Sequence, residues 1–96
     1  MLKAGDLVEI SPWKVFWSIL DENGMFGARG DTGFNVGPTP NYFGVIVSMQ
    51  KRYVIASAAI SAAMKPKYEY AYYVLLHDGR RGWSSSAGLT RLLNEP

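Results

Sequence analysis

The sequence predicts a mainly β protein, and two observations support that fold class. Two dipeptides typical of hairpin turns, Asn23-Gly24 and Asp78-Gly79, stand between aromatic and aliphatic runs. Such pairs favour tight turns because glycine adopts positive φ without a Cβ clash. Residues 13–20 and 68–76 alternate with period two, which is the spacing of side chains in a strand. A chain of 96 residues is expected to form one domain, 1–96, around a single core.

The first half of the chain predicts strands separated by a long connection. Residues 6–10 form the first predicted strand, and residues 13–20 form a second that should reverse near Asp21–Gly24. Residues 24–40 are rich in glycine and predict a surface loop or an irregular hairpin. Residues 42–49 predict the next strand, and its continuous apolar run from Val45 to Val47 should be buried on both sides.

The second half begins with an ambiguous segment. Residues 52–55 either continue the preceding strand or form another, and residues 56–64 are rich in alanine with apolar residues at helical spacing before Pro66. They predict a short helix or an extended arm. Residues 68–76 form a strand with Val74 and Leu76 on one face and Leu75 on the other. Residues 80–84 pair back after the Asp78-Gly79 turn, and residues 89–93 close the sheet. The expected core is Leu7, Ile10, Val45, Val47, Val74, Leu76, Trp83 and Leu89.

Five of these segments together resemble a known framework. They are Gly5-Asp6-Leu7-Val8, Gly44-Val45-Ile46-Val47, Tyr73-Val74-Leu75-Leu76, Gly82-Trp83 after the Asp-Gly turn, and Leu89. This pattern resembles the five-stranded SH3-like barrel, and in particular the small SH3-like proteins encoded by tailed bacteriophages. The resemblance implies a virion component. It leaves two insertions outside the minimal barrel, about 12–41 and 50–67, where individual function should lie.

Composition argues against several kinds of site. The chain has no cysteine and one histidine, His77, which removes thiol chemistry, cysteine-based zinc sites and any site with two histidines. His77, Asp78 and one of Ser84–Ser86 contain the three residue types of a catalytic triad. The hairpin turn already accounts for the presence of Asp78. We therefore expect no enzyme activity, no cofactor, no metal and no small-molecule substrate. Residues 1–6 lack the apolar segment of a signal peptide, so the expected location is a virion or the host cytoplasm, without a membrane.

Aromatic residues beyond the needs of a small core point to protein partners. Large rigid rings are enriched at the centres of protein interfaces, although the insertion could instead fold over the barrel and bury them. Residues 1–50 hold three basic and five acidic residues, whereas residues 51–96 hold seven basic and three acidic ones. This polarity suits head-to-tail assembly of identical subunits. The predicted interface residues are Trp13, Phe16, Trp17, Met25, Phe26, Phe34, Ile60 and Met64.

Two further readings stay open. Basic residues interleaved with tyrosines are typical of single-strand nucleic-acid binders, and the candidates are Lys51, Arg52, Lys65, Lys67, Tyr70, Arg80 and Arg81. Arg29-Gly30-Asp31 matches the tripeptide that adhesive proteins present to integrins, or is a solvated turn. The leading expectation is a non-enzymatic structural or interaction subunit that docks neighbouring subunits. The alternatives are a nucleic-acid-binding module and a regulator that binds a host protein.

Overall fold

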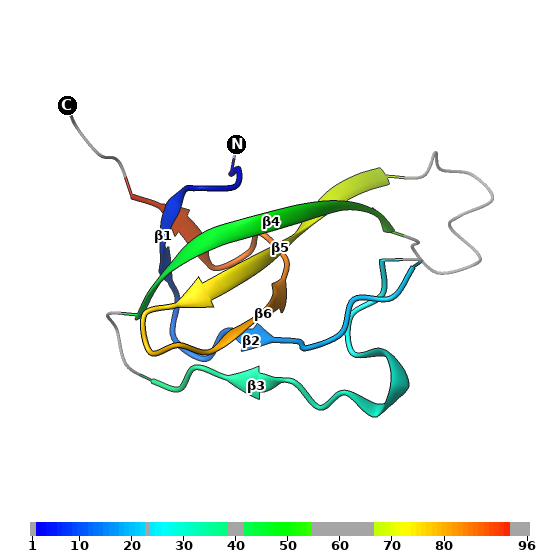
Figure 1. Cartoon of the computed structure of the whole chain (residues 1–96), viewed down its shortest axis with the longest axis horizontal. Helices are drawn as coiled ribbons and strands as arrows, with labels where there is room; N and C mark the ends of the chain where they lie inside the picture. Colours follow the sequence, from blue (N-terminus) through cyan, green and yellow to red (C-terminus); the bar gives the residue numbers. More distant parts are fainter. Residues whose placement is uncertain (1, 23, 39–41, 55–66, 93–96) are drawn as a thin grey trace.

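The computed structural model describes residues 2–22, 24–38, 42–54 and 67–92, and Figure 1 shows its strands. The fold is mainly β, as predicted. The strands are β1 (Leu7–Ile10), β2 (Val15–Phe16), β3 (Phe34–Asn35), β4 (Tyr42–Val54), β5 (Lys67–Leu76), β6 (Arg81–Ser84) and β7 (Leu89–Arg91), with a 3₁₀ turn η1 (Ala28–Gly30) between β2 and β3.

The strands form two antiparallel sheets. The larger has the order β6-β5-β4-β1-β7, and the smaller joins β2 to β3. A bridge between Trp17 and Trp83 connects the end of β2 to β6, and the two backbones exchange hydrogen bonds of 2.8 and 2.6 Å. The edge strands β6 and β7 do not pair with each other, so the larger sheet is open rather than a closed barrel.

The core lies between the inner face of the larger sheet and the β2–β3 region. Phe16 of β2 is completely buried, and its ring stacks on that of Phe34 with centroids 5.5 Å apart. Gly82 of β6 lies directly against Phe16, because a Cβ atom added at Gly82 would lie 2.8 Å from the Cβ of Phe16. The buried cluster is Val8, Ile10, Phe16, Val36, Ile46, Tyr72, Val74, Leu76 and Leu89.

The longest elements are β4 and β5, which pair from Gly44↔Leu76 to Val54↔Lys67 with a register shift between Ile46 and Ser48. Residues 52–54 therefore continue β4, and the second predicted insertion, about 50–67, overlaps both strands. Figure 1 shows both strands extending beyond the rest of the sheet. The predicted helix or arm at 56–64, with Ile60 and Met64, lies outside the described residues.

The apolar run in β4 is not buried on both sides. Ile46 is fully buried, but Val45 is 39% exposed and Val47 is 51% exposed. Alternate residues of a strand face opposite sides of its sheet, and the described residues leave the outer side of β4 open at Val45. Leu7 and Trp83, also expected in the core, are half-buried.

Both predicted turns are present. Gly24 has φ +80° and donates its N–H to the Asp21 carbonyl at 2.9 Å, and Leu20 and Phe26 pair across the turn. Gly79 has φ +93°, and its N–H bonds to the carbonyl of Leu76 at 3.0 Å. The second turn sets the register of β5 against β6.

Gly79→Val should destabilise the protein by about 2 kcal/mol, because a β-branched residue is strained at positive φ. The space around Gly79 is open, with no atom within 4 Å of an added Cβ, so a loss would report backbone strain alone. Urea denaturation measures it, with Gly79→Asn as the control because asparagine tolerates the left-handed region. Equal stability of the valine and asparagine variants would contradict this account of the turn.

Candidate functional site: an apolar groove on the outer face of the sheet

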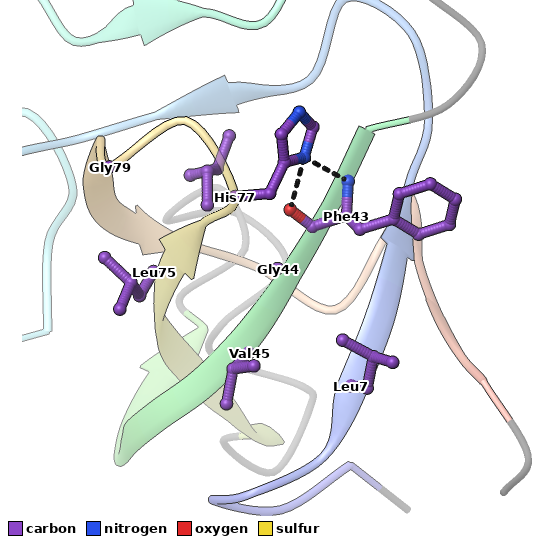
Figure 2. A pocket seen from close by; sticks show the side chains of 8 residues that line it. Leu7, Phe43, Gly44, Val45, Leu75, His77 and Gly79 are labelled. Atoms are coloured by element: carbon purple, nitrogen blue, oxygen red, sulfur yellow. Dashed lines mark hydrogen bonds between the residues drawn. The ribbon is translucent and has the colours of Figure 1, made fainter.

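A groove of about 370 Å³ lies on the outer face of the larger sheet. It is lined mainly by apolar side chains from three neighbouring strands, and Figure 2 shows these residues along β1, β4 and the end of β5. We call this the outer-face groove. Its lining residues are Leu7, Phe43, Gly44, Val45, Leu75, Leu76, His77 and Gly79.

Strand register explains why these side chains meet. Leu7 of β1 pairs with Val45 of β4, and Val45 pairs with Leu75 of β5. Directly opposed residues in antiparallel strands have Cβ atoms about 4.5–5.5 Å apart on one face. The three residues therefore form a continuous apolar row across the sheet. Leu75 is 41% exposed, similar to Val45.

His77 is the one ionisable residue among those lining the groove. Its Nδ1 lies 3.2 Å from the backbone nitrogen of Phe43 and 3.1 Å from the Phe43 carbonyl oxygen, as Figure 2 shows. Depending on the tautomer, Nδ1 accepts from the Phe43 N–H or donates to the Phe43 carbonyl, and either hydrogen bond places the ring beside β4. The lining offers apolar contact and one imidazole, whose ring packs against the Tyr42 ring with centroids 5.2 Å apart.

The charged residues around the groove are unevenly arranged. Arg81 pairs with Leu75 in register and is exposed. Glu9 pairs with Phe43 on the β1 side and is also exposed. Asp78 and Arg80 pair with each other, with Arg80 Nη2 2.7 Å from Asp78 Oδ2. Arg80 Nε also donates a hydrogen bond to Asp78 Oδ2 at 2.8 Å, and this bond lowers the pKa of Asp78. The groove therefore has a cation on the β6 side and an anion on the β1 side.

The predicted interface aromatics are not one surface. Phe16 is in the core, so its side chain offers nothing to a partner, and this expectation is corrected. Trp17 and Phe34 are half-buried, and Phe26 is half-buried beneath the guanidinium of Arg52, which lies 4.1 Å from the ring centroid. Gly27 and Gly33 of the first insertion lie against the Trp17 ring. Met25 and Trp13 remain exposed, at 55% and 61%.

Trp13 has an unusual backbone for a large residue. Its φ is +64°, and its N–H donates to the Gly37 carbonyl at 2.8 Å. A residue with a Cβ in this region costs of the order of 1 kcal/mol. Trp13 therefore has an exposed side chain and a strained backbone. Glycine at this position would have no such strain.

Trp13→Gly should therefore leave the protein more stable than Trp13→Ala, by about 1 kcal/mol. Both variants remove the exposed ring and keep the backbone N–H, but only glycine relieves the strain at positive φ. Urea denaturation of the two variants, compared at equal m value, measures the difference. If the alanine variant is as stable as the glycine variant, the backbone at this turn is unstrained.

The predicted nucleic-acid residues do not gather in one patch. Lys51 pairs with Tyr70, whereas Arg81 pairs with Leu75, about 17 Å away along β5 at 3.3–3.4 Å per residue. Tyr70 packs against the core, and Lys51 Nζ lies over the Tyr68 ring at 4.2 Å. Lys67 belongs to β5, and Lys65 lies outside the described residues.

Two of the three predicted arginines, Arg52 and Arg80, already have partners within the chain. Arg52 Nε lies 3.5 Å from Glu69 Oε1, but without a hydrogen-bonding geometry, so this contact is charge attraction alone. The guanidinium of Arg80, paired with Asp78, also donates to the Tyr42 hydroxyl at 3.3 Å. Binding phosphate would compete with these contacts.

Asp31 of the Arg29-Gly30-Asp31 tripeptide is engaged within the chain. Its two carboxylate oxygens accept hydrogen bonds from the N–H groups of Ile19 at 2.9 Å and Gly33 at 3.0 Å. Partial desolvation raises the pKa of Asp31. These hydrogen bonds and those from Ser18 lower it by more, so the pKa lies below its usual value. The carboxylate closes a loop, which supports the reading of a structural turn.

Of the residues considered as a catalytic triad, Ser84, Asp78 and His77 each contact a different partner. The buried Ser84 donates its hydroxyl to the Val15 carbonyl at 2.9 Å, Asp78 pairs with Arg80, and His77 faces Phe43. Within the described ranges, no group of three or more histidine, aspartate or glutamate side chains could hold a metal ion.

The sequence prediction missed the outer-face groove. Val45 and Leu7 were expected in the core, and Leu75 was placed on the second face of its strand without a role. A signal was present, because Leu75 and Tyr73 alternate with the buried Val74 and Leu76. Both faces of this strand are therefore apolar. A single core covers only one face, so the second apolar face indicates another contact surface.

Comparisons with protein-family models, with curated proteins and with solved structures find no match to this chain. In the part of the chain that the structure describes, no helix is long and apolar enough to cross a membrane.

Proposed function

We propose that this chain is a non-enzymatic structural or interaction subunit that docks a protein partner on the outer-face groove. The observation that carries the proposal is the exposed row Leu7, Val45 and Leu75 on a sheet whose other face is well packed. Concave apolar surfaces of this kind favour partner side chains, because burying them removes apolar area from water at about 25 cal/mol per Å².

The sequence resemblance suggests a setting for this subunit. The five segments that resemble an SH3-like barrel of tailed bacteriophages coincide with β1, β4, β5, β6 and β7, which are the strands of the larger sheet. We infer an SH3-like arrangement that is opened out, in a component of a phage particle. A regulator that binds a host protein would use the same groove. The nucleic-acid alternative has less support, because its cations are spread out and two of them are paired.

Selection from a displayed random-peptide library tests the proposed function. Peptides would be selected on the wild-type chain and counter-selected on a Val45→Asp, Leu75→Asp double variant, whose changes lie on the exposed outer face. We expect apolar peptides that bind at micromolar concentration and at least tenfold more weakly to the double variant. Val15→Ser is the matched control, because Val15 is exposed on β2 away from the groove.

The same material separates the alternatives. Failure to recover any peptide that distinguishes the wild type from the double variant would contradict docking at the groove. A single-stranded oligonucleotide that binds at about 0.15 M salt, and is lost in Arg80→Glu, Arg81→Glu, would favour the nucleic-acid reading instead. We expect only weak attraction that disappears at this salt concentration.

A further inference from the structure

We propose that the occupant of the outer-face groove is a second copy of this chain, which inserts the hairpin around Glu22 and Met25. This inference rests on the proposed function and names its partner. We call the described residues of this hairpin, Leu20–Glu22 and Gly24–Phe26, the acidic hairpin.

The acidic hairpin exposes one acidic and one apolar side chain at its turn. Leu20 pairs with Phe26 at its base, and the Met25 N–H donates to Asp21 Oδ1 at 2.8 Å across the turn. Glu22 is exposed at the tip, and Met25 exposes 55% of its surface. A methionine side chain is unbranched and polarizable, so it adapts to an irregular apolar groove.

The turn of the hairpin is held against its own chain at Gly24, which lies between Glu22 and Met25 in the sequence. A Cβ atom added at the buried Gly24 would lie 2.5 Å from the Cβ of Arg52, so the turn packs directly on β4. The Arg52 guanidinium covers the Phe26 ring, and Glu69 lies beside Arg52. The tip is therefore presented in one orientation, which lowers the entropy cost of binding.

The hairpin cannot reach the groove of its own chain. It packs on Arg52, which is seven residues along β4 from Val45, or about 20 Å at 3.3 Å per residue with one bulge. Figure 1 shows the turn after β2 beside the far end of β4, away from the turn that joins β5 to β6. An acidic hairpin in the groove must therefore come from another copy.

Charge determines the orientation of this contact. Arg81 stands exposed beside Leu75 on the β6 side of the groove, and Glu9 stands beside Phe43 on the β1 side. A tip carrying Glu22 is attracted to Arg81 and repelled by Glu9, so Glu22 faces β6 while Met25 covers the apolar row. The unequal charge of the two halves of the sequence agrees with this polarity.

The hairpin and the groove are different surfaces of the chain, at opposite ends of β4, so we take the proposed contact to repeat head-to-tail. Each copy would use its hairpin on one neighbour and its groove on another, which gives a ring if the rotation closes and a filament if it does not. This differs from a two-fold dimer, in which the same surface would meet itself.

Sedimentation equilibrium of complementary variants tests the inference. Glu22→Arg alters the hairpin and leaves the groove intact, whereas Arg81→Glu alters the groove and leaves the hairpin intact. Each variant alone should self-associate at least tenfold more weakly than the wild type. An equimolar mixture should recover association to within about threefold of the wild type, since every mixed contact joins opposite charges. Val15→Ser is the control with unchanged association, and thermal unfolding checks that each variant is folded.

A second pair of variants probes the apolar part of the contact. Met25→Ser and Val45→Asp should each prevent assembly beyond a monomer, and their mixture should give a one-to-one dimer, because one intact hairpin and one intact groove remain. A two-fold exchange of hairpins differs in the wild type, which would then stop at a dimer instead of forming larger assemblies.

Three results would overturn the inference: a wild-type chain that is monomeric at millimolar concentration, variants that leave assembly unchanged, or assembly lost in Trp13→Ser and retained in Met25→Ser. If peptides bind the groove of a monomeric chain, the proposed function stands and only the second copy is excluded.

Discussion

Replacing Phe16 with alanine is expected to destabilise the protein by about 3–5 kcal/mol, the usual cost of removing a buried aromatic ring. Phe16 is the largest completely buried side chain, and its ring stacks on Phe34. A domain of this size has a stability of about 5–15 kcal/mol, so the variant should be near its unfolding midpoint at moderate urea concentrations. Urea denaturation followed by tryptophan fluorescence measures the loss.

The neighbouring residue supplies a matched control for this prediction. Val15 precedes Phe16 on β2 and points away from the core, with 36% of its surface exposed, so Val15→Ala should cost less than about 1 kcal/mol. A similar loss at the two positions would show that β2 does not pack its Phe16 face against the larger sheet. If Phe16→Ala retained the stability of the wild type, the core described here would be incorrect.

Gly44→Ala is expected to cost about 3 kcal/mol, which is a large effect for one methyl group. A Cβ atom at this position would lie 2.7 Å from Val74 Cγ1 and 2.9 Å from the Leu75 carbonyl oxygen. The second of these atoms belongs to the backbone of β5, so it cannot move without separating the two strands. β4 is paired on both sides here, to β1 and β5, and thermal unfolding should show the loss.

A double-mutant cycle identifies the cause. Removing the Val74 methyl groups with Val74→Ala relieves the side-chain part of the clash, so Gly44→Ala should cost less in that background than in the wild type. Purely additive losses would mean that the strain comes from elsewhere. A fully stable Gly44→Ala variant would contradict the close approach of β4 and β5.

The two hairpin turns and most strand positions could be read from the sequence because they depend on neighbouring residues. Gly24 and Gly79 both have positive φ, and the dipeptides Asn23-Gly24 and Asp78-Gly79 predict the turns. The alternation in residues 72–76 separated Val74 and Leu76 from Leu75 correctly, and Leu75 is exposed as that pattern requires. Local geometry alone determines such features.

The candidate site could not be read in the same way. A row such as Leu7, Val45 and Leu75 joins residues up to 68 positions apart, and only the pairing of β1, β4 and β5 places them side by side. The sequence suggested Phe16 for an interface and Val45 for the core, whereas in the structure Phe16 is completely buried and Val45 is 39% exposed. In the sequence Arg52 and Arg80 look like cations available to a ligand. In the structure they lie beside Glu69 and Asp78.

The sequence by itself determined the β class, the turns and the two faces of β5, because period two and turn chemistry are properties of short segments. The tertiary structure alone decided which face is covered. Covering requires a second layer, and that layer is formed here by Phe16, Phe34 and Val36 folding over the inner side of the sheet. No described element does the same on the outer side at Val45 and Leu75. The period-two pattern assigns the residues of a strand to its two faces. Segments distant in the sequence pack against one face, and they determine which face stays exposed to water.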